Sequence, residues 1–207
     1  MKNAITITIK LLIITIVSAI ALGAVNYITA GPIEEQMKAA ALEARQSAFP
    51  EAAEFKPLYD PDAAETADVT LESLLGTDEA PKAYGIIKNV YTAYDANGNE
   101  LGITAGVVTK GFNSGLNLTI GIALNGKITG VIVGDNTETA GLGAKASEAS
   151  FEGQYTGKTA LLNVVKASPG ESDIQAITGA TITTKGITNA VNTVAEFYAA
   201  VTGGANE

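Results

Sequence analysis

The sequence predicts an α+β protein, with an antiparallel sheet on which helices pack, preceded by one N-terminal transmembrane helix. Three observations support this class. A long uncharged apolar run opens the chain, two Asn-Gly pairs each separate two alternating apolar segments, and a segment with helical periodicity closes the chain. Alternation with period two is typical of strands, and a repeat near 3.6 residues is typical of helices.

The transmembrane helix is expected over residues 11–30, within the 23 uncharged residues Leu11–Ile33. At about 1.5 Å per residue, such a helix spans the roughly 30 Å hydrocarbon layer of a bilayer. Two lysines precede the run and two glutamates follow it. This bias predicts a cytoplasmic N-terminus, residues 1–10, in a single-pass protein of the cell membrane with everything else on the extracytoplasmic side. The alternative is a signal peptide cleaved near residues 19–21.

Residues 31–80 are expected to form an acidic helix and stalk. The segment 34–80 has an excess of nine acidic residues, which equals the net charge of the whole chain. It starts with a helical pattern that Pro50 should end, and continues as a passage rich in Pro, Asp and Ala. Two interpretations stay open: a solvated spacer that keeps the outer domain clear of anionic lipid, or an acidic docking surface.

The outer domain is expected over residues 81–207 and begins with two hairpins. Their turns are Asn97-Gly98 and Asn125-Gly126. Asn-Gly between alternating apolar runs is the strongest short signal for a hairpin, because both turn residues accept a positive φ. The expected strands, including two short ones near the end of the chain, cover 84–95, 100–110, 116–124, 127–133, 161–165 and 173–177.

A helix is expected over residues 183–201 and should pack on the sheet. Gly203-Gly204 should end it. The residues that share its apolar face are Ile187, Val191, Val194, Ala195 and Tyr198.

Composition excludes several kinds of chemistry. The chain has no cysteine and no histidine, which excludes a protein-ligated iron–sulfur cluster, a thiolate zinc site and a Ser-His-Asp triad. No metal site is therefore expected, and electron transfer would need a cofactor held by other means. The pI of about 4.5 argues against nucleic acid as a partner.

The loop that leads into the final helix is rich in hydroxyl groups. It reads Thr178-Gly179-Ala180-Thr181-Ile182-Thr183. Its glycine permits a tight turn, and the free N–H groups of a helix N-terminus favour an anion such as phosphate. The alternative from physics alone is simple capping, since threonine is a common N-cap.

At this loop the chain resembles a known family. Thr178-Gly179-Ala180-Thr181 followed by Thr183 is similar to the S/T-G-A-T-x-T signature of the FMN-binding domains of Rnf and Nqr respiratory complexes. Upstream, Glu138-Thr139-Ala140-Gly141-Leu142-Gly143 resembles the E-T-P-G-L-G loop of that family, with Ala140 in place of proline. The size of the chain and its single anchor resemble the Rnf G subunit most.

The resemblance implies an FMN joined through its phosphate to Thr181. It also implies that Thr178, Gly179, Ala180 and Thr183 surround the phosphate, and that a second loop and a nearby lysine approach the isoalloxazine ring or phosphate. The residues of this second set are Glu138, Thr139, Gly141, Leu142, Gly143 and Lys145. Their glycines are expected to let the backbone come close to the ring.

The implied function is that of a flavoprotein subunit in an ion-translocating ferredoxin:NAD oxidoreductase complex, relaying electrons between other membrane and redox subunits. The resemblance also implies maturation by an ApbE-type flavin transferase. From the residues alone, attachment by a partner enzyme is expected, because a threonine hydroxyl is a poor nucleophile and no histidine is available to activate it. Gln175 stands where the preferred motif of the transferase often has aspartate. Alternatives are an Nqr C-like subunit, a stand-alone extracytoplasmic flavoprotein, and a cofactor-free surface binding module.

Overall fold

The computed structural model describes residues 2–78, 80–113, 115–159 and 161–203. The chain divides into two compact units after Glu43. In the first unit, helix α1 (Lys2–Ala48, continuing into the second unit) contains the one described segment that is long and apolar enough to cross a membrane.

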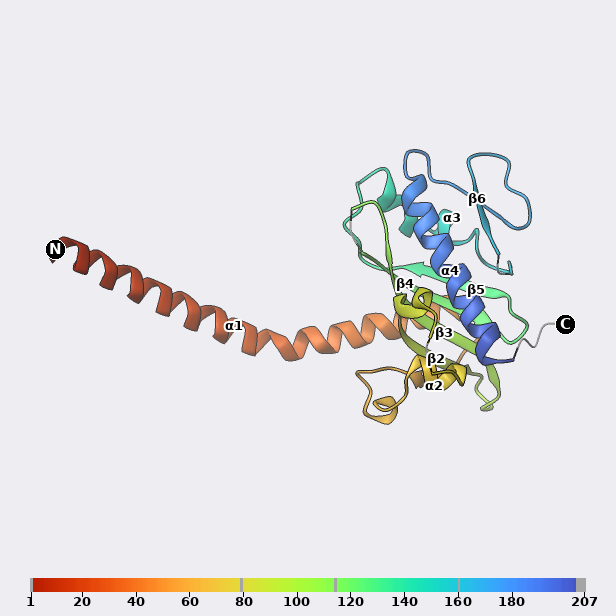
Figure 1. Cartoon of the computed structure of the whole chain (residues 1–207), viewed down its shortest axis with the longest axis horizontal. Helices are drawn as coiled ribbons and strands as arrows, with labels where there is room; N and C mark the ends of the chain where they lie inside the picture. The colour runs from red at the N-terminus through yellow and green to blue at the C-terminus, as the bar shows by residue number, and fades with distance from the viewer. Residues whose placement is uncertain (1, 79, 114, 160, 204–207) are drawn as a thin grey trace. The chain divides into compact units, whose positions relative to one another are not determined.

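The second unit is built on a five-stranded antiparallel sheet with strand order β1-β2-β3-β4-β5 (Figure 1). A separate two-stranded parallel sheet pairs β6 with β7. The strands are β1 (Glu54–Tyr59), β2 (Ile87–Tyr94), β3 (Glu100–Lys110), β4 (Gly115–Ala123), β5 (Ile128–Val133), β6 (Asn163–Val165) and β7 (Asp173–Gln175). The α-helices of this unit are α2 (Leu71–Leu75), α3 (Ala149–Glu152) and α4 (Thr181–Val201).

The predicted α+β class is confirmed, and both predicted hairpins are present. The expected turn chemistry is wrong in one respect. Gly98 and Gly126 have φ of 84° and 73°, whereas neither preceding asparagine has a positive φ. In the second turn, the N–H of Gly126 donates to the carbonyl of Ala123 at 2.8 Å, and the N–H of Ala123 donates to the carbonyl of Lys127 at 2.9 Å. A single left-handed glycine therefore closes the loop.

The interpretation of residues 31–80 as helix and stalk does not match the structure beyond α1. Strand β1 joins the sheet beside β2, and helix α2 follows, capped by Thr70. The sequence concealed β1 because Pro57 interrupts a short segment that also contains two charged residues, Glu54 and Lys56, a composition that suits the outermost strand of a sheet. The two late strands were expected, but not their parallel pairing.

Helix α4 packs on one face of the sheet (Figure 1). It begins two residues earlier than expected, at Thr181, and its described end is followed by Gly203 with φ of 72°; Gly204 lies outside the described residues. All five residues predicted for its apolar face are buried, namely Ile187, Val191, Val194, Ala195 and Tyr198. Burial of this apolar stripe against the sheet stabilises the domain.

The opposite face of the sheet receives the end of α1. Thr129 donates a hydrogen bond of 2.6 Å to the carbonyl of Ala48, and a Cβ on Gly121 would overlap that carbonyl at 2.5 Å. The Arg45 guanidinium lies 3.6 Å above the ring of Tyr91, whose hydroxyl donates to Asp60. Burial and this hydrogen bond raise the pKa of Tyr91 to about 12. The last turn of α1 is thereby part of the folded domain.

Gly186 sets how closely α4 approaches the end of β3. A Cβ there would overlap the carbonyl oxygen of Lys110. We expect Gly186→Ala to lower the free energy of unfolding by roughly 1–3 kcal/mol, because the helix must shift away from β3. Urea denaturation of the protein measures this. Gly85→Ala is the matched control, since no atom lies within 4 Å of its added Cβ; an equal loss in both variants would contradict the close-approach argument.

Candidate functional site

The hydroxyl-rich loop forms the N-terminus of α4. Gly179 has φ of 79°, which turns the chain into the helix, and Ala180 is the N-cap residue. No side chain caps this helix end, so simple capping does not explain the threonines. The first N–H groups of the helix have no intrahelical carbonyl as partner and carry its positive dipole end.

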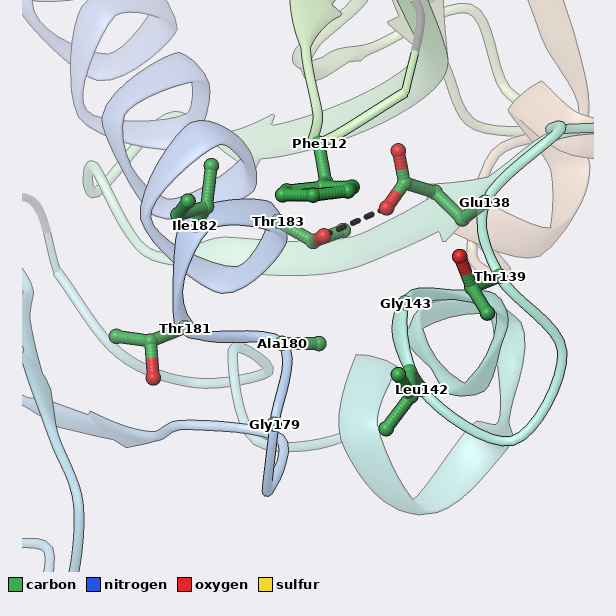
Figure 2. Close-up of a pocket in the computed structure, with 10 residues that line it drawn as sticks. All are labelled: Phe112, Glu138, Thr139, Leu142, Gly143, Gly179, Ala180, Thr181, Ile182 and Thr183. Atoms are coloured by element: carbon green, nitrogen blue, oxygen red, sulfur yellow. Dashed lines mark hydrogen bonds between the residues drawn. The ribbon is translucent and has the colours of Figure 1, made fainter.

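Thr181 is the first residue of α4, and its side chain is half-buried. Within the described ranges, the hydroxyls of Thr178 and Thr181 have no hydrogen-bond partner. Figure 2 shows the Thr181 side chain directed away from the hydrogen-bonded pair of Thr183 and Glu138. A nucleophilic or ligand-binding hydroxyl in this position is accessible and uncommitted.

A cavity of about 290 Å³ lies beside the start of α4, and we call it the α4 cavity. Its walls come from the turn after β3, the loop after β5 and the start of α4 (Figure 2). The lining residues are Phe112, Glu138, Thr139, Leu142, Gly143, Gly179, Ala180, Thr181, Ile182 and Thr183.

A second hollow, of about 430 Å³, meets the α4 cavity at Gly179 and Thr181. We call it the Lys166 hollow, and its other lining residues are Lys166, Ala176, Ile177 and Thr178. Thr181 therefore borders two hollows of different character: one has apolar walls, and the other offers a lysine.

Glu138, in the loop after β5, forms hydrogen bonds with two other segments of the α4 cavity, the start of α4 and the β3–β4 turn. Its side chain is buried, and one carboxylate oxygen accepts the hydroxyl of Thr183 at 2.7 Å. The other oxygen accepts the backbone N–H of Asn113 at 3.0 Å. Because a buried carboxylate needs such donors, Glu138 fixes the loop after β5 to both α4 and the β3–β4 turn.

Glycines 111 and 143 make room for this carboxylate. A Cβ on Gly111 or on Gly143 would overlap an oxygen of Glu138, and the Cβ position of Gly143 is also 3.0 Å from the Thr183 hydroxyl. Gly143 therefore has a structural role beside Glu138, and the approach of its backbone to the ring stays a prediction. Thr183 is fully buried, and its hydroxyl donates to Glu138, while its expected bond to a phosphate stays a prediction.

The rim of the α4 cavity is apolar and exposed. Phe112 is 64% exposed, Ile182 58% and Leu142 41%, although large apolar side chains usually avoid water. Leu142 also contacts the loop of α4, since a Cβ on Gly179 would lie 2.9 Å from its methyl group. Three such side chains around one cavity suit a planar ligand that has apolar faces.

The structure brings eight of the eleven sequence-predicted site residues together around the α4 cavity. The other three lie elsewhere. Gly141 is an exposed turn residue with φ of 77°, Thr178 lines the Lys166 hollow, and Lys145 lines a further shallow hollow with Thr178. Phe112 and Ile182 were missed. No sequence signal pointed to Phe112, whereas Ile182 lies inside the recognised motif.

Glu138 yields a test of this architecture. Glu138→Ala leaves the Asn113 N–H and the buried Thr183 hydroxyl without their acceptor, so we expect a loss of about 1–3 kcal/mol in the free energy of unfolding. Urea denaturation measures it. The control is Glu148→Ala, which removes an exposed carboxylate nearby without a cap bond. A loss no larger than that of the control would refute the role given to Glu138.

Comparison with known proteins follows this geometry. Residues 111–196, which include the whole α4 cavity, match the FMN-binding domain family. The chain is 37% identical to the G subunit of the Na(+)-translocating ferredoxin:NAD(+) oxidoreductase complex of Acetobacterium woodii, over 91% of this chain and 88% of the relative. It is 40% identical to the G subunit of the proton-translocating complex of Clostridium ljungdahlii, over 46% and 52%.

A solved structure has the same fold. Shewanella oneidensis NqrC superimposes with a TM-score of 0.54 at 20% identity, over 75% of this chain and 86% of that one. Together with the near full-length match to the Acetobacterium woodii protein, this agrees with the resemblance inferred from the two loops. The chain belongs to the G-subunit family of Rnf-type ion-translocating ferredoxin:NAD oxidoreductase complexes.

Proposed function

We propose that this chain is the FMN-carrying electron-transfer subunit of an Rnf-type ion-translocating complex, with the FMN attached through its phosphate to Thr181. The observation that carries the proposal is the placement of Thr181. Its hydroxyl has no partner in the described part of the chain, stands at the N-terminus of a 21-residue helix, and borders a cavity with apolar walls.

The residues present fit an FMN. An uncapped helix N-terminus suits a phosphate diester, because its N–H groups and dipole favour negative charge. Gly179 turns the backbone sharply before it. When bound, the flavin supplies the redox chemistry, which none of the side chains of this chain can provide. The protein contributes position, an anion site and a surface that excludes water from one side of the ring.

Attachment requires an outside catalyst. The Thr181 oxygen would form a bond to the FMN phosphorus of FAD, the bond between the two phosphates would break, and AMP would leave while the hydroxyl loses its proton. The chain has no histidine to take that proton. We therefore propose an ApbE-type flavin transferase as the maturation partner. The other partners are the membrane and redox subunits of the complex, with which electrons are exchanged.

The segment before Thr181 is open to such an enzyme. Gln175 and Thr178 are exposed, and the backbone of Gln175 is held by Gln154, whose side-chain oxygen accepts its N–H at 2.7 Å. Gln175, which replaces the aspartate that the transferase often prefers, thus presents a neutral side chain on the surface. The same surface includes Lys145, which lines the shallow hollow shared with Thr178.

The attachment site gives a direct test. We expect the wild-type protein from its native host to exceed the mass of the bare chain by one FMN less a water, and to fluoresce in a denaturing gel. Thr181→Ala should abolish both signals and leave the fold intact. The matched control is Thr156→Ala, which removes an exposed hydroxyl outside this loop and should keep the flavin. An unmodified wild-type mass, or flavin retained by Thr181→Ala, would overturn the proposal.

We also propose that α1 anchors the protein in the cell membrane, with the N-terminus in the cytoplasm and the FMN domain on the extracytoplasmic side. Lysines before the apolar segment and glutamates after it support this orientation. At an extracytoplasmic location a flavin that dissociates would not be replaced. A covalent bond to the protein prevents this loss.

The orientation is open to a labelling experiment, because the chain has no cysteine of its own. In intact cells, a membrane-impermeant maleimide should label Asn97→Cys, which lies in an exposed hairpin turn. It should label Asn3→Cys only after the cells are lysed. The reverse pattern would show the opposite orientation, and release of either protein into the medium would show that the N-terminal segment is cleaved.

A further inference from the structure

Phe112 is a large apolar side chain that the fold holds in the open. It is 64% exposed, and it lies in the turn between β3 and β4 at the mouth of the α4 cavity (Figure 2). We infer that Phe112 is the side chain against which the isoalloxazine ring lies, so that the ring occupies the α4 cavity and not the Lys166 hollow. This inference rests on the proposed attachment at Thr181.

Contacts on both sides of Phe112 fix the turn that carries it. On one side, Gly111 lies so close to the Glu138 carboxylate that a Cβ would overlap it. On the other, the backbone N–H of Asn113 donates to Glu138 at 3.0 Å, and the Asn113 amide donates to the carbonyl of Thr137, also at 3.0 Å. An exposed side chain on a free loop would be mobile. The backbone on both sides of Phe112 is instead held in place, and this limits the positions that its ring can take.

The same turn is fixed against α4. Thr109 donates a hydrogen bond of 3.1 Å to the carbonyl of Gly186, and the carbonyl of Lys110 fills the space where a Cβ of Gly186 would be. Ile182 lies one helical turn before Gly186 and so shares its face of α4. Figure 2 shows the ring of Phe112 between Ile182 and Glu138, above the cavity. Phe112 and Ile182, the residue that follows Thr181, thus line the same cavity.

The polar groups of the α4 cavity are largely committed to each other. Glu138 accepts from Thr183 and Asn113, which leaves the apolar side chains of Phe112, Leu142 and Ile182 as the ligand-facing surface. Aromatic rings pack favourably on other aromatic rings, and an isoalloxazine is a wide, planar one. The Lys166 hollow has no aromatic side chain among its lining residues and offers a cation, which suits the phosphate side of the ester better.

Tryptophan substitution tests where the ring lies. An excited flavin in contact with an indole accepts an electron from it and returns the electron without emitting light, so fluorescence is lost. The chain contains no tryptophan, and a single indole is therefore an unambiguous probe. We expect Phe112→Trp, in the flavin-loaded protein, to lose most of its fluorescence relative to wild type. Fluorescence is normalised to the fraction of chains that carry the FMN mass increment.

Two further variants complete the design. Lys166→Trp places the indole in the other hollow, and Leu124→Trp places it at the opposite end of β4, on an exposed residue; both should stay fluorescent. Quenching by Lys166→Trp without quenching by Phe112→Trp would overturn the inference and place the ring in the Lys166 hollow. Equal fluorescence in all loaded variants would also overturn it. A wild type without the mass increment would instead count against the proposed attachment itself.

If Phe112→Trp fails to fold, as judged by circular dichroism, Phe112→Ala serves in its place. Removal of the aromatic wall exposes one face of the ring, so iodide should quench the flavin more strongly than in wild type, with Leu124→Ala unchanged. Equal iodide quenching in wild type and Phe112→Ala would mean that Phe112 does not cover the ring.

Discussion

One buried carboxylate organises the site. Glu138 is bound by a backbone N–H and a threonine hydroxyl and, among the described residues, is paired with no lysine or arginine. A buried charge of this kind is stable only when its donors stay in place, because burying an unpaired charge is strongly unfavourable. The β3–β4 turn, the loop after β5 and the first turn of α4 are therefore positioned together, and the α4 cavity is the space among them.

Close backbone approaches on both faces of the sheet support this arrangement. On one face, Gly186 lets α4 come close to the end of β3. On the other, Gly121 and Gly130 receive the last turn of α1 at the carbonyl of Ala48. Small residues at these positions remove the side-chain layer that normally separates a helix from a sheet. The sheet is consequently fixed between α4 and the last turn of α1.

Local sequence was sufficient for elements with strong periodicity. The hairpins and α4 were predicted because alternation, Asn-Gly pairs and a helical apolar face are local signals. Strand β1 was not, since its pairing with β2 comes from a partner about 35 residues away and its own residues, with Pro57, are typical of a loop. The parallel pairing of β6 with β7 was equally invisible, because three-residue strands carry almost no pattern.

In the candidate site, too, the features carried by local sequence were predictable, and those that depend on distant segments were not. Thr181 and its neighbours were recognisable as a motif, and so was the loop with Glu138. The roles within the site were not, because they depend on distances between segments: Thr183 donates to Glu138 across 45 positions of the chain, and Gly143 accommodates a carboxylate. Phe112 is an ordinary turn residue in the sequence and becomes a cavity wall only through the fold.

The parallel pair β6–β7 has a consequence for access to Thr181. The segment that leads to Thr181 is held by three paired positions, by the side chain of Gln154, and by the hydroxyl of Thr184, which accepts the N–H of Ile177 at 3.2 Å. Short pairs of this kind belong to the least stable cooperative units of a native protein and open locally without global unfolding. Local opening of this pair would therefore leave more of the chain before Thr181 accessible while the main sheet stays folded.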